Sequence, residues 1–240
     1  MNRPLSIVLA GSALLAGLWT ATATGAGAAT TTTTTTAPPT PADTWLIRAI
    51  GAEAKVGSVR VQGTIKQGKT NIKVDFVVNG DGEGGGTFQQ SGSTIQLKRV
   101  GPLLYFNAPT KFWRTNSTTG AAQAKTYGGK WIEVSALDSR FQSFDQFLNV
   151  SDLVTAVFQG HTTPLTLKSG TYQGHKIKIV ADKVTSKGKT SSGEMYIAAT
   201  GKPVVLKIID RGPTNGSTFV FTSYGKAKGI TTPPEPINLT

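Results

Sequence analysis

The chain has 240 residues, 38% of them hydrophobic and 16% charged, and it carries a net charge of +12. It contains no cysteine, which excludes disulfides, thiolate metal sites and a lipid anchor on a cysteine side chain. The basic excess suits an anionic partner, although the lysines are scattered and form no dense run. An anionic membrane surface or an acidic cell-wall polymer fits this charge, and so does a plain solvated surface.

Residues 1–28 have the pattern of an export signal. Arg3 is the only charged residue before Asp43, and residues 5–19 form an apolar run of fifteen residues. That run is shorter than the roughly 20 apolar residues that span a bilayer, and it has the length of a signal-peptide core. Residues 26–28, Ala-Gly-Ala, offer a small-residue cleavage site, while an uncleaved anchor stays the alternative.

A linker and one domain are expected after the signal. Residues 29–42 contain seven consecutive threonines and a proline-rich stretch, a composition that favours an extended, solvated tether. Residues 43–240 are enough for a single domain with a substantial core. In the signal, Leu18 stands where a lipoprotein would carry its lipid-bearing cysteine after Leu15-Ala16-Gly17. We therefore expect an exported protein of the cell envelope or medium, not anchored through cysteine, with no nucleic acid as partner.

Most of the domain alternates between apolar and polar residues. Residues 59–66 and 72–79 place valine, isoleucine and phenylalanine at alternate positions, which predicts strands with one buried and one wet face. Glycine-containing turns such as residues 67–69 separate the segments. Further strands are expected at residues 94–100, 103–107, 130–134, 175–180, 194–199, 204–209 and 217–224. The pattern predicts a mainly antiparallel meander of hairpins with added helices, an α+β fold.

Two helices are expected within this β-rich sequence. Residues 43–56 carry apolar side chains at helical spacing. Residues 143–159 begin with a capping box, Ser143 and Gln146, and have an apolar stripe wider than a minimal core face. Its members are Phe144, Phe147, Leu148, Val150, Leu153, Val154, Val157 and Phe158. A stripe of this width serves either as packed core or as the wall of a ligand site.

The sequence gives little support for a catalytic site or a cofactor site. Residues 80–85 match the dinucleotide fingerprint G-x-G-x-x-G, but the preceding strand has a wet face and no acid follows until Glu133, so we interpret them as a flexible hairpin tip. The two histidines, His161 and His175, come without a nucleophile elbow, and they are too few for a zinc site. We expect no cofactor, no metal and no enzymatic activity.

The domain resembles the LolA-like lipid carriers, and most of all the actinobacterial LppX/LprG lipoprotein family. The segment Gly129-Lys130-Trp131-Ile132-Glu133-Val134 is similar to a strand of that family, as are the paired segments 194–198 and 201–208 and the closing segment 219–225. The order and spacing of these short motifs, across residues 43–236, carry the resemblance. It implies a curved antiparallel half-barrel that packs helices on its concave face around an apolar cavity.

The resemblance also implies a function. Family members hold acyl chains in the cavity and move lipids or lipoglycans through the cell envelope without covalent chemistry. We expect this chain to be a monomeric carrier of that kind, although the missing anchor cysteine departs from the pattern. Candidate cavity residues, each with packed core as the alternative, are Phe76, Val78, Leu97, Phe106, Phe147, Leu148, Val154, Phe158, Ile197 and Leu206.

Two other functions stay open. The first is a tethered module that binds a cell-wall polymer or another polyanion through its basic surface. The second is a hydrolase with an unrecognised site that uses His161 or His175.

Overall fold

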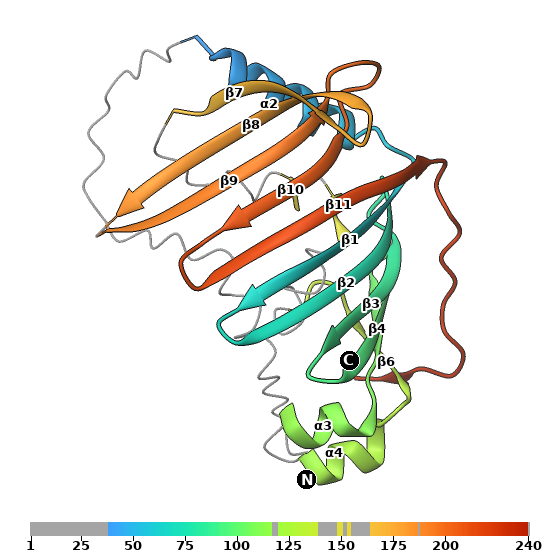
Figure 1. Cartoon of the computed structure of the whole chain (residues 1–240). Helices are drawn as coiled ribbons and strands as arrows, with labels where there is room; N and C mark the ends of the chain where they lie inside the picture. The colour runs from blue at the N-terminus through green and yellow to red at the C-terminus, as the bar shows by residue number, and fades with distance from the viewer. Residues whose placement is uncertain are drawn as a thin grey trace, which may run out of the picture.

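The structure, a computed structural model, describes residues 38–116, 120–138, 148–150, 153–154, 164–186 and 188–239 (Figure 1). These residues form one open, twelve-stranded sheet. Its strands are β1 (Ser58–Gln67), β2 (Thr70–Asn79), β3 (Gly84–Gln90), β4 (Ser93–Val100), β5 (Leu103–Asn107), β6 (Trp131–Ser135), β7 (Thr166–Tyr172), β8 (His175–Ser186), β9 (Lys189–Ala198), β10 (Val205–Arg211), β11 (Asn215–Gly225) and β12 (Ile237–Asn238). The helices of the described residues are α2 (Pro41–Glu53), α3 (Thr110–Asn116) and α4 (Gly120–Tyr127).

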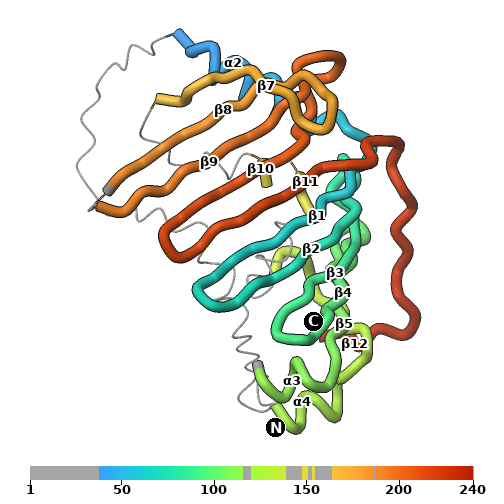
Figure 2. Tube along the Cα trace, in the orientation of Figure 1, coloured from blue at the N-terminus to red at the C-terminus, as the bar shows by residue number. Residues whose placement is uncertain are grey.

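The sheet consists of two meanders joined side by side. The strand order is β12-β6-β5-β4-β3-β2-β1-β11-β10-β9-β8-β7, so β1 to β6 follow one another in space and β7 to β11 do the same. The antiparallel pair β1 and β11 joins the two halves. The other pairs are antiparallel as well, except that β12 runs parallel to β6. The predicted antiparallel α+β fold, with a strongly curved sheet, is confirmed (Figure 2).

The predicted strands are present, with several ends displaced by a few residues. One interpretation is wrong: the glycine-rich residues 80–85 do not form only a hairpin tip, because Gly84, Gly85 and Gly86 already belong to β3 and pair with β2 and β4. The strands β3, β7 and β12 and the helices α3 and α4 were not predicted. The helix expected at residues 143–159 lies mostly outside the described residues, although Val150, Leu153 and Val154 are helical.

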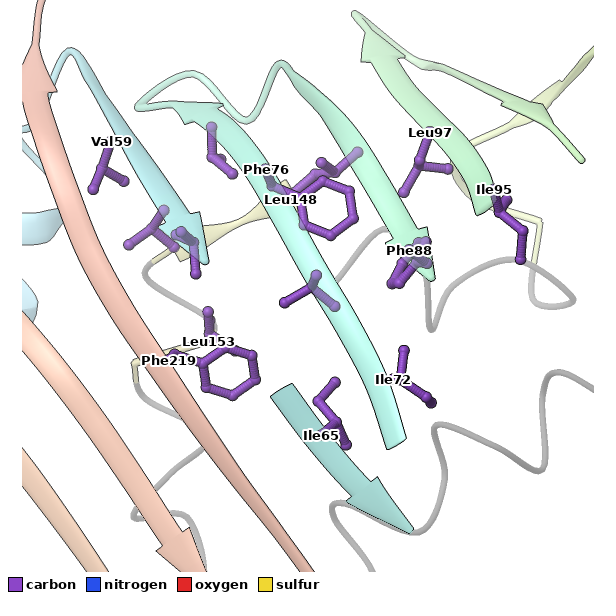
Figure 3. Packing of buried hydrophobic residues seen from close by; sticks show 14 of the residues in the cluster. Val59, Ile65, Ile72, Phe76, Phe88, Ile95, Leu97, Leu148, Leu153 and Phe219 are labelled. Carbon is purple, nitrogen blue, oxygen red and sulfur yellow. The ribbon is translucent and has the colours of Figure 1, made fainter. Parts of the chain in front are cut away.

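Alternation along the strands separates a buried inner face from a polar outer face. In β2, Ile72, Val74 and Phe76 are buried while Lys73 is exposed and Asp75 is half-buried. The buried side chains of the strands form one cluster, part of which is drawn in Figure 3. Burial of these side chains removes apolar surface from water and is the main source of stability.

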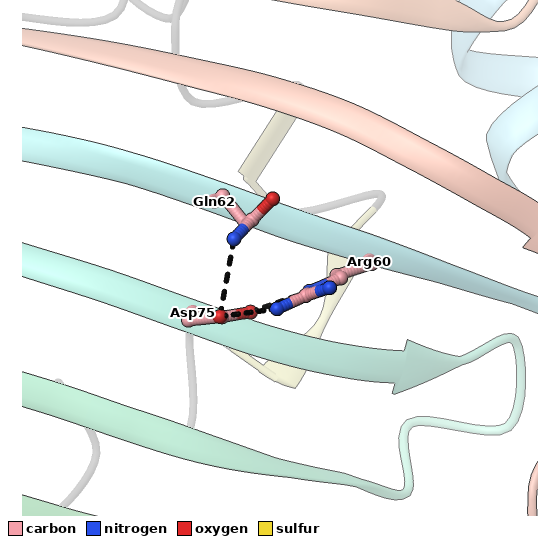
Figure 4. A network of polar contacts seen from close by, with 3 residues as sticks. All are labelled: Arg60, Gln62 and Asp75. Carbon is pink, nitrogen blue, oxygen red and sulfur yellow. Dashed lines mark hydrogen bonds and ion pairs between the residues drawn. The ribbon is translucent and has the colours of Figure 1, made fainter.

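Polar side chains pair on the outer face. Arg60 donates from Nε to Asp75 Oδ1 at 2.8 Å and from a terminal nitrogen to Oδ2 at 2.6 Å, and Gln62 Nε2 donates to the same Oδ2 at 3.1 Å (Figure 4). The pair Arg60 and Asp75 therefore links the neighbouring strands β1 and β2 across the wet side of the sheet. Both side chains are substantially exposed, so the pair is screened by solvent.

The helix α2 begins at a well-formed cap. Thr40 is the N-cap residue, and Asp43 N donates to Thr40 Oγ1 at 3.2 Å while Thr40 N donates to Asp43 Oδ2 at 2.8 Å. Pro41 stands in the first turn, where its missing N–H costs nothing. The helix packs its buried residues Ala42 and Ala49 toward β7 and β8.

Helix α2 and the pair of helices α3 and α4 lie at different ends of the sheet. The short helices α3 and α4 lie beyond β5 and β6, at the opposite end of the sheet from α2 (Figure 2). Trp113 of α3 anchors them, with its ring 5.8 Å from that of Phe106 on β5 and 5.4 Å from that of Tyr127 on α4. The central strands between these ends are left for other segments to cover.

The chain after β11 forms a strap that returns to the other edge of the sheet (Figure 1). Asn79 at the end of β2 holds it, because Asn79 Nδ2 donates to Lys228 O at 2.7 Å and Lys228 N donates to Asn79 Oδ1 at 3.0 Å. Ser58 Oγ donates to Lys226 O at 2.7 Å. Within the described ranges, no helix is both long and apolar enough to cross a membrane.

Candidate functional site

The inner face of the sheet carries a continuous row of apolar residues across seven neighbouring strands. Strand register places the row directly, since each member pairs with the next one along it. The members are Phe221 of β11, Val61 of β1, Phe76 of β2, Gly86 of β3, Leu97 of β4, Phe106 of β5 and Ile132 of β6. We call this set the inner row. Six strand spacings of about 4.8 Å give it a length of about 29 Å.

Gly86 gives the inner row its one position without a side chain. A Cβ atom on Gly86 would lie 2.6 Å from Phe76 Cδ1, so the ring of Phe76 occupies the space that a side chain there would need. The same ring meets Phe88 edge-on, with centroids 4.9 Å apart. Phe76 therefore packs against β3 at two points, in the space that Gly86 leaves and against the ring of Phe88.

A short described segment between β6 and β7 covers the middle of this face. Leu148, Val150, Leu153 and Val154 belong to the same buried cluster as the strands, and Figure 3 shows Leu148 and Leu153 among the strand side chains. The contact with β3 is close, because a Cβ atom on Gly84 would lie 3.3 Å from Leu148 Cδ2. The inner row is thus covered by side chains that come from outside the sheet.

Most of the predicted cavity residues come together here. Seven of the ten are buried in the cluster: Phe76, Val78, Leu97, Phe106, Leu148, Val154 and Ile197, none more than 6% exposed. Leu206 is half-buried and lies at an irregularity of β10, because Val205 pairs with Ile197 while Lys207 pairs with Tyr196. Phe147 and Phe158 lie outside the described residues.

Further members of the inner face were not singled out from the sequence. Phe88, Met195, Ile208, Phe219 and Phe221 are all buried in the cluster. Their positions follow from the same two-residue alternation that identified Phe76. What the alternation does not give is the register, which decides which residues of neighbouring strands lie side by side.

A buried polar contact joins α2 to the far half of the sheet. Glu53 is 2% exposed, and its Oε1 accepts a hydrogen bond from Val205 N and lies beside the Tyr224 hydroxyl, both at 2.7 Å. The Tyr224 hydroxyl also lies 2.6 Å from Val205 O. A hydroxyl has one proton, so making both of its contacts as hydrogen bonds requires a proton on the carboxyl group.

The surroundings of Glu53 favour that protonated form. Burial raises the pKa of Glu53 above its ordinary 4.5, against the lowering effect of the hydrogen bonds from Val205 and Tyr224. Burial and the adjacent Glu53 also raise the pKa of Tyr224. Glu53 Oε2 is buried and has no hydrogen-bond partner, which is less costly for a neutral carboxyl than for a carboxylate. The contact therefore joins the end of α2 to the strands β10 and β11 through a buried, protonated carboxyl group.

The described residues offer little for covalent chemistry or metal binding. His175 is exposed at the start of β8, across from Tyr172 of β7, and His161 lies outside the described ranges. Among the residues that the structure describes, no group of three or more histidine or acidic side chains is placed to share a metal ion. The feature that distinguishes this molecule is the apolar inner row.

Comparison with solved structures identifies the architecture. LppX, a lipoprotein of Mycobacterium tuberculosis, superposes with a TM-score of 0.52 at 10% identity, over 78% of this chain and 97% of LppX. LprF of Mycobacterium bovis superposes with a TM-score of 0.51 at 13% identity, over 81% of this chain and 98% of LprF. The chain has the LppX fold. No protein-family model and no curated protein sequence matches it.

This likeness confirms the predicted resemblance at the level of the fold. In this chain the inner row lies on the face of the sheet that Leu148, Val150, Leu153 and Val154 cover. At these identities the likeness concerns the course of the backbone. What the inner row can bind therefore has to be inferred from its apolar side chains.

Proposed function

We propose that the protein is an exported, non-enzymatic carrier that holds the acyl chains of a lipid or lipoglycan against the inner row. The observation that carries this proposal is the continuity of the row across seven strands. Its length of about 29 Å exceeds the hydrocarbon depth of one lipid leaflet, about 15 Å or half of a roughly 30 Å core. One extended acyl chain therefore fits along it.

Acyl binding needs no set of precisely placed polar groups. Each buried methylene contributes about 0.8 kcal/mol, so apolar walls alone can hold a chain. The resemblance to LolA-like carriers and the LppX fold support the same interpretation. Placement in the cell envelope follows from the predicted export signal and is part of the proposal.

Lipid binding must compete with the side chains that cover the inner row. Leu148 and Val154 are fully buried and Leu153 nearly so. We propose that an acyl chain takes their place on the sheet, so that loading separates Leu148, Leu153 and Val154 from the strands. In the absence of lipid, these covering side chains stay packed on the inner row.

The test is organic extraction and mass spectrometry of the full chain purified from its own envelope or medium. Leu97→Asp places a charge in the inner row itself, where Leu97 is 1% exposed, and Leu137→Asp is the matched control because Leu137 is 91% exposed. We expect roughly one lipid per protein in the wild type and in Leu137→Asp, and a several-fold loss in Leu97→Asp. Leu97→Ala, which keeps the site apolar, should retain lipid and separates loss of binding from loss of folding.

A protein that yields no lipid, and that takes up none when lipids are added, would overturn the proposal. Equal lipid content in Leu97→Asp and Leu137→Asp, with both variants folded by circular dichroism, would place the lipid elsewhere on the molecule.

A further inference from the structure

One face of α2 is turned away from the sheet and combines apolar and basic side chains. Ala42, Ala49 and Glu53 face inward and are buried. On the other side, Ile47 is 61% exposed, and Arg48, Gly51 and Lys55 are exposed as well. Among the described residues, Ile47 and Leu137 are the large hydrophobic side chains that are strongly exposed. An exposed isoleucine on a helix beside two cations calls for an explanation.

The same end of the molecule has a basic hollow of about 480 Å³. It is lined by Arg48, Gly51, Ala52 and Lys55 of α2 and its C-terminal end, together with Lys202 and Pro203 of the β9–β10 turn. Three of these six residues are cationic, and none of the described residues that line the hollow is acidic. The small residues Gly51 and Ala52 leave the hollow open between the three cations.

The acids of α2 do not neutralise this hollow. Glu53 points to the other side of the helix, where it contacts Val205 and Tyr224. Asp43 lies in the first turn of α2, at the opposite end of the helix from Lys55, and contacts Thr40. The positive potential of Arg48, Lys55 and Lys202 is therefore directed toward solvent.

A tryptophan stands beside this basic surface. Trp45 is half-buried, with Arg48 Cζ 4.5 Å and Lys178 Nζ 5.9 Å from its ring centroid. Lys178 Nζ also donates to Ser169 Oγ at 2.8 Å. Tryptophan with neighbouring arginine and lysine is the combination that favours the headgroup region of a bilayer, because the ring is apolar at its body and polar at its N–H.

From these observations we infer that the outward face of α2, with Lys202, docks on an anionic lipid bilayer. We call the set Ile47, Arg48, Lys55 and Lys202 the docking face. The cations attract anionic headgroups, at about a fivefold gain in partition for each basic residue near the surface. Ile47 enters the apolar boundary below the headgroups. A soluble polyanion would use the three cations and would gain nothing from Ile47, which is why a membrane is the better occupant.

The position of α2 in the chain agrees with this inference. The helix begins at Pro41, directly after the threonine- and proline-rich segment that follows the apolar head. A tether at this point would hold α2 closer to a membrane than the far ends of the strands. The inference deepens the proposed function, on which it rests for its biological sense, because a lipid carrier has to meet a membrane to load or unload.

The test uses the full chain and vesicles of phosphatidylcholine with or without phosphatidylglycerol, with binding measured by cosedimentation. The first variant combines Arg48→Glu, Lys55→Glu and Lys202→Glu. The matched control combines Lys66→Glu, Lys69→Glu and Lys189→Glu, which change the net charge equally. These three lysines are exposed at the other end of the strands, in or next to the β1–β2 and β8–β9 turns.

We expect the first variant to bind phosphatidylglycerol vesicles at least tenfold more weakly than the wild type, and the control to lose about threefold or less. High salt should abolish the difference, because exposed charges are screened. Ile47→Asn should weaken binding several-fold, while Leu137→Asn, the same change at the other exposed hydrophobic residue, should have no effect. Binding to vesicles without phosphatidylglycerol should be the same in the wild type and both triple variants, since any contribution of the apolar head is common to them.

Three results would overturn the docking face. The first variant could bind as the wild type does, or both triple variants could lose binding equally. Alternatively, the first variant could lose binding to soluble polyphosphate as strongly as to vesicles while Ile47→Asn changes neither, which would indicate a polyanion site. Extractable lipid measured in the same preparations separates the two proposals: loss of vesicle binding with unchanged lipid concerns docking alone, and absence of lipid with intact vesicle binding concerns the carrier alone.

Discussion

The hydroxyl of Tyr224 lies 2.7 Å from Oε1 of Glu53, two residues that are 171 positions apart in the sequence. Through this contact the end of α2 is fixed to β10 and β11, on the side of the molecule opposite the docking face of the helix. The pKa of Glu53 is raised by burial, so the native state holds a proton that the unfolded chain releases near its ordinary 4.5.

The first prediction concerns the pH dependence that follows from Glu53. A carboxyl whose pKa is raised by folding contributes its full stability below about pH 4.5, and this contribution is lost as the pH rises through the folded-state pKa. Glu53→Gln keeps a side chain of the same shape that can accept and donate hydrogen bonds, and it removes the titration. We expect the free energy of unfolding of Glu53→Gln to fall less between pH 4 and pH 8 than that of the wild type.

Urea unfolding across this pH range measures the difference, with the exposed Glu235→Gln as the control. If the free energy of unfolding depended on pH in the same way in the wild type and in Glu53→Gln, this would contradict a buried, protonated Glu53.

The second prediction compares two glycines. A Cβ atom on Gly86 would overlap Asp75 O and lie 2.6 Å from Phe76 Cδ1, whereas Gly51 in α2 has nothing within 4 Å of its Cβ position. Gly86→Ala should destabilise the protein by about 1–3 kcal/mol through overpacking. Gly51→Ala should stabilise it by up to about 1 kcal/mol through helix propensity. Thermal unfolding of both variants, compared with the wild type, measures these changes in stability. A Gly86→Ala variant as stable as the wild type would show that Phe76 has room to move.

The third prediction concerns Arg60 and Asp75 on the outer face (Figure 4). Arg60 lowers the pKa of Asp75 below its ordinary 3.8, so the pair contributes stability above that pH and loses it as the pH falls. Because both side chains are exposed, we expect only a weak coupling that salt removes. A double-mutant cycle with Arg60→Gln and Asp75→Asn measures it, and a larger coupling that persists in high salt would contradict a solvent-screened pair.

The fourth prediction is a threshold in acyl chain length. Separating Leu148, Leu153 and Val154 from the sheet costs about 5–9 kcal/mol, at about 1.5–3 kcal/mol for each buried side chain. An acyl chain of about sixteen carbons returns roughly 12 kcal/mol and one of about eight carbons roughly 6 kcal/mol. Long chains should therefore bind and short ones should not.

Native mass spectrometry of delipidated protein, incubated with single-chain lysophosphatidylglycerols of either chain length, tests this threshold. Equal retention of both lipids would mean that the covering side chains do not compete with the ligand.

Sequence reasoning found the parts of the fold that depend on local pattern. The alternation of Ile72, Val74 and Phe76 was enough to place β2 and its buried face. It failed at β7, where most side chains are exposed and only Leu167 and Tyr172 are apolar members of the strand. It also failed at Gly84–Gly86, because residues without side chains show no alternation even though the backbone pairs normally with β2 and β4.

The candidate site was predictable in composition but not in arrangement. Phe76, Leu97 and Phe106 were each identified as inward-facing, yet their alignment in one row depends on the register that the hairpin turns impose. The contact between Glu53 and Tyr224 depends on the pairing of β1 with β11, which joins the two meanders and has no local signal in the sequence. Long-range pairing is what the residues alone did not reveal.

The most direct measurement for the central claim is photo-crosslinking with a phospholipid that carries a reactive group near the end of an acyl chain. If the inner row holds the chain, adducts will map to inward residues such as Phe76, Leu97 and Phe106 on β2, β4 and β5. Adducts on outward residues of the same strands, such as Val77 or Lys98, or no adduct on a protein that carries lipid, would contradict the account.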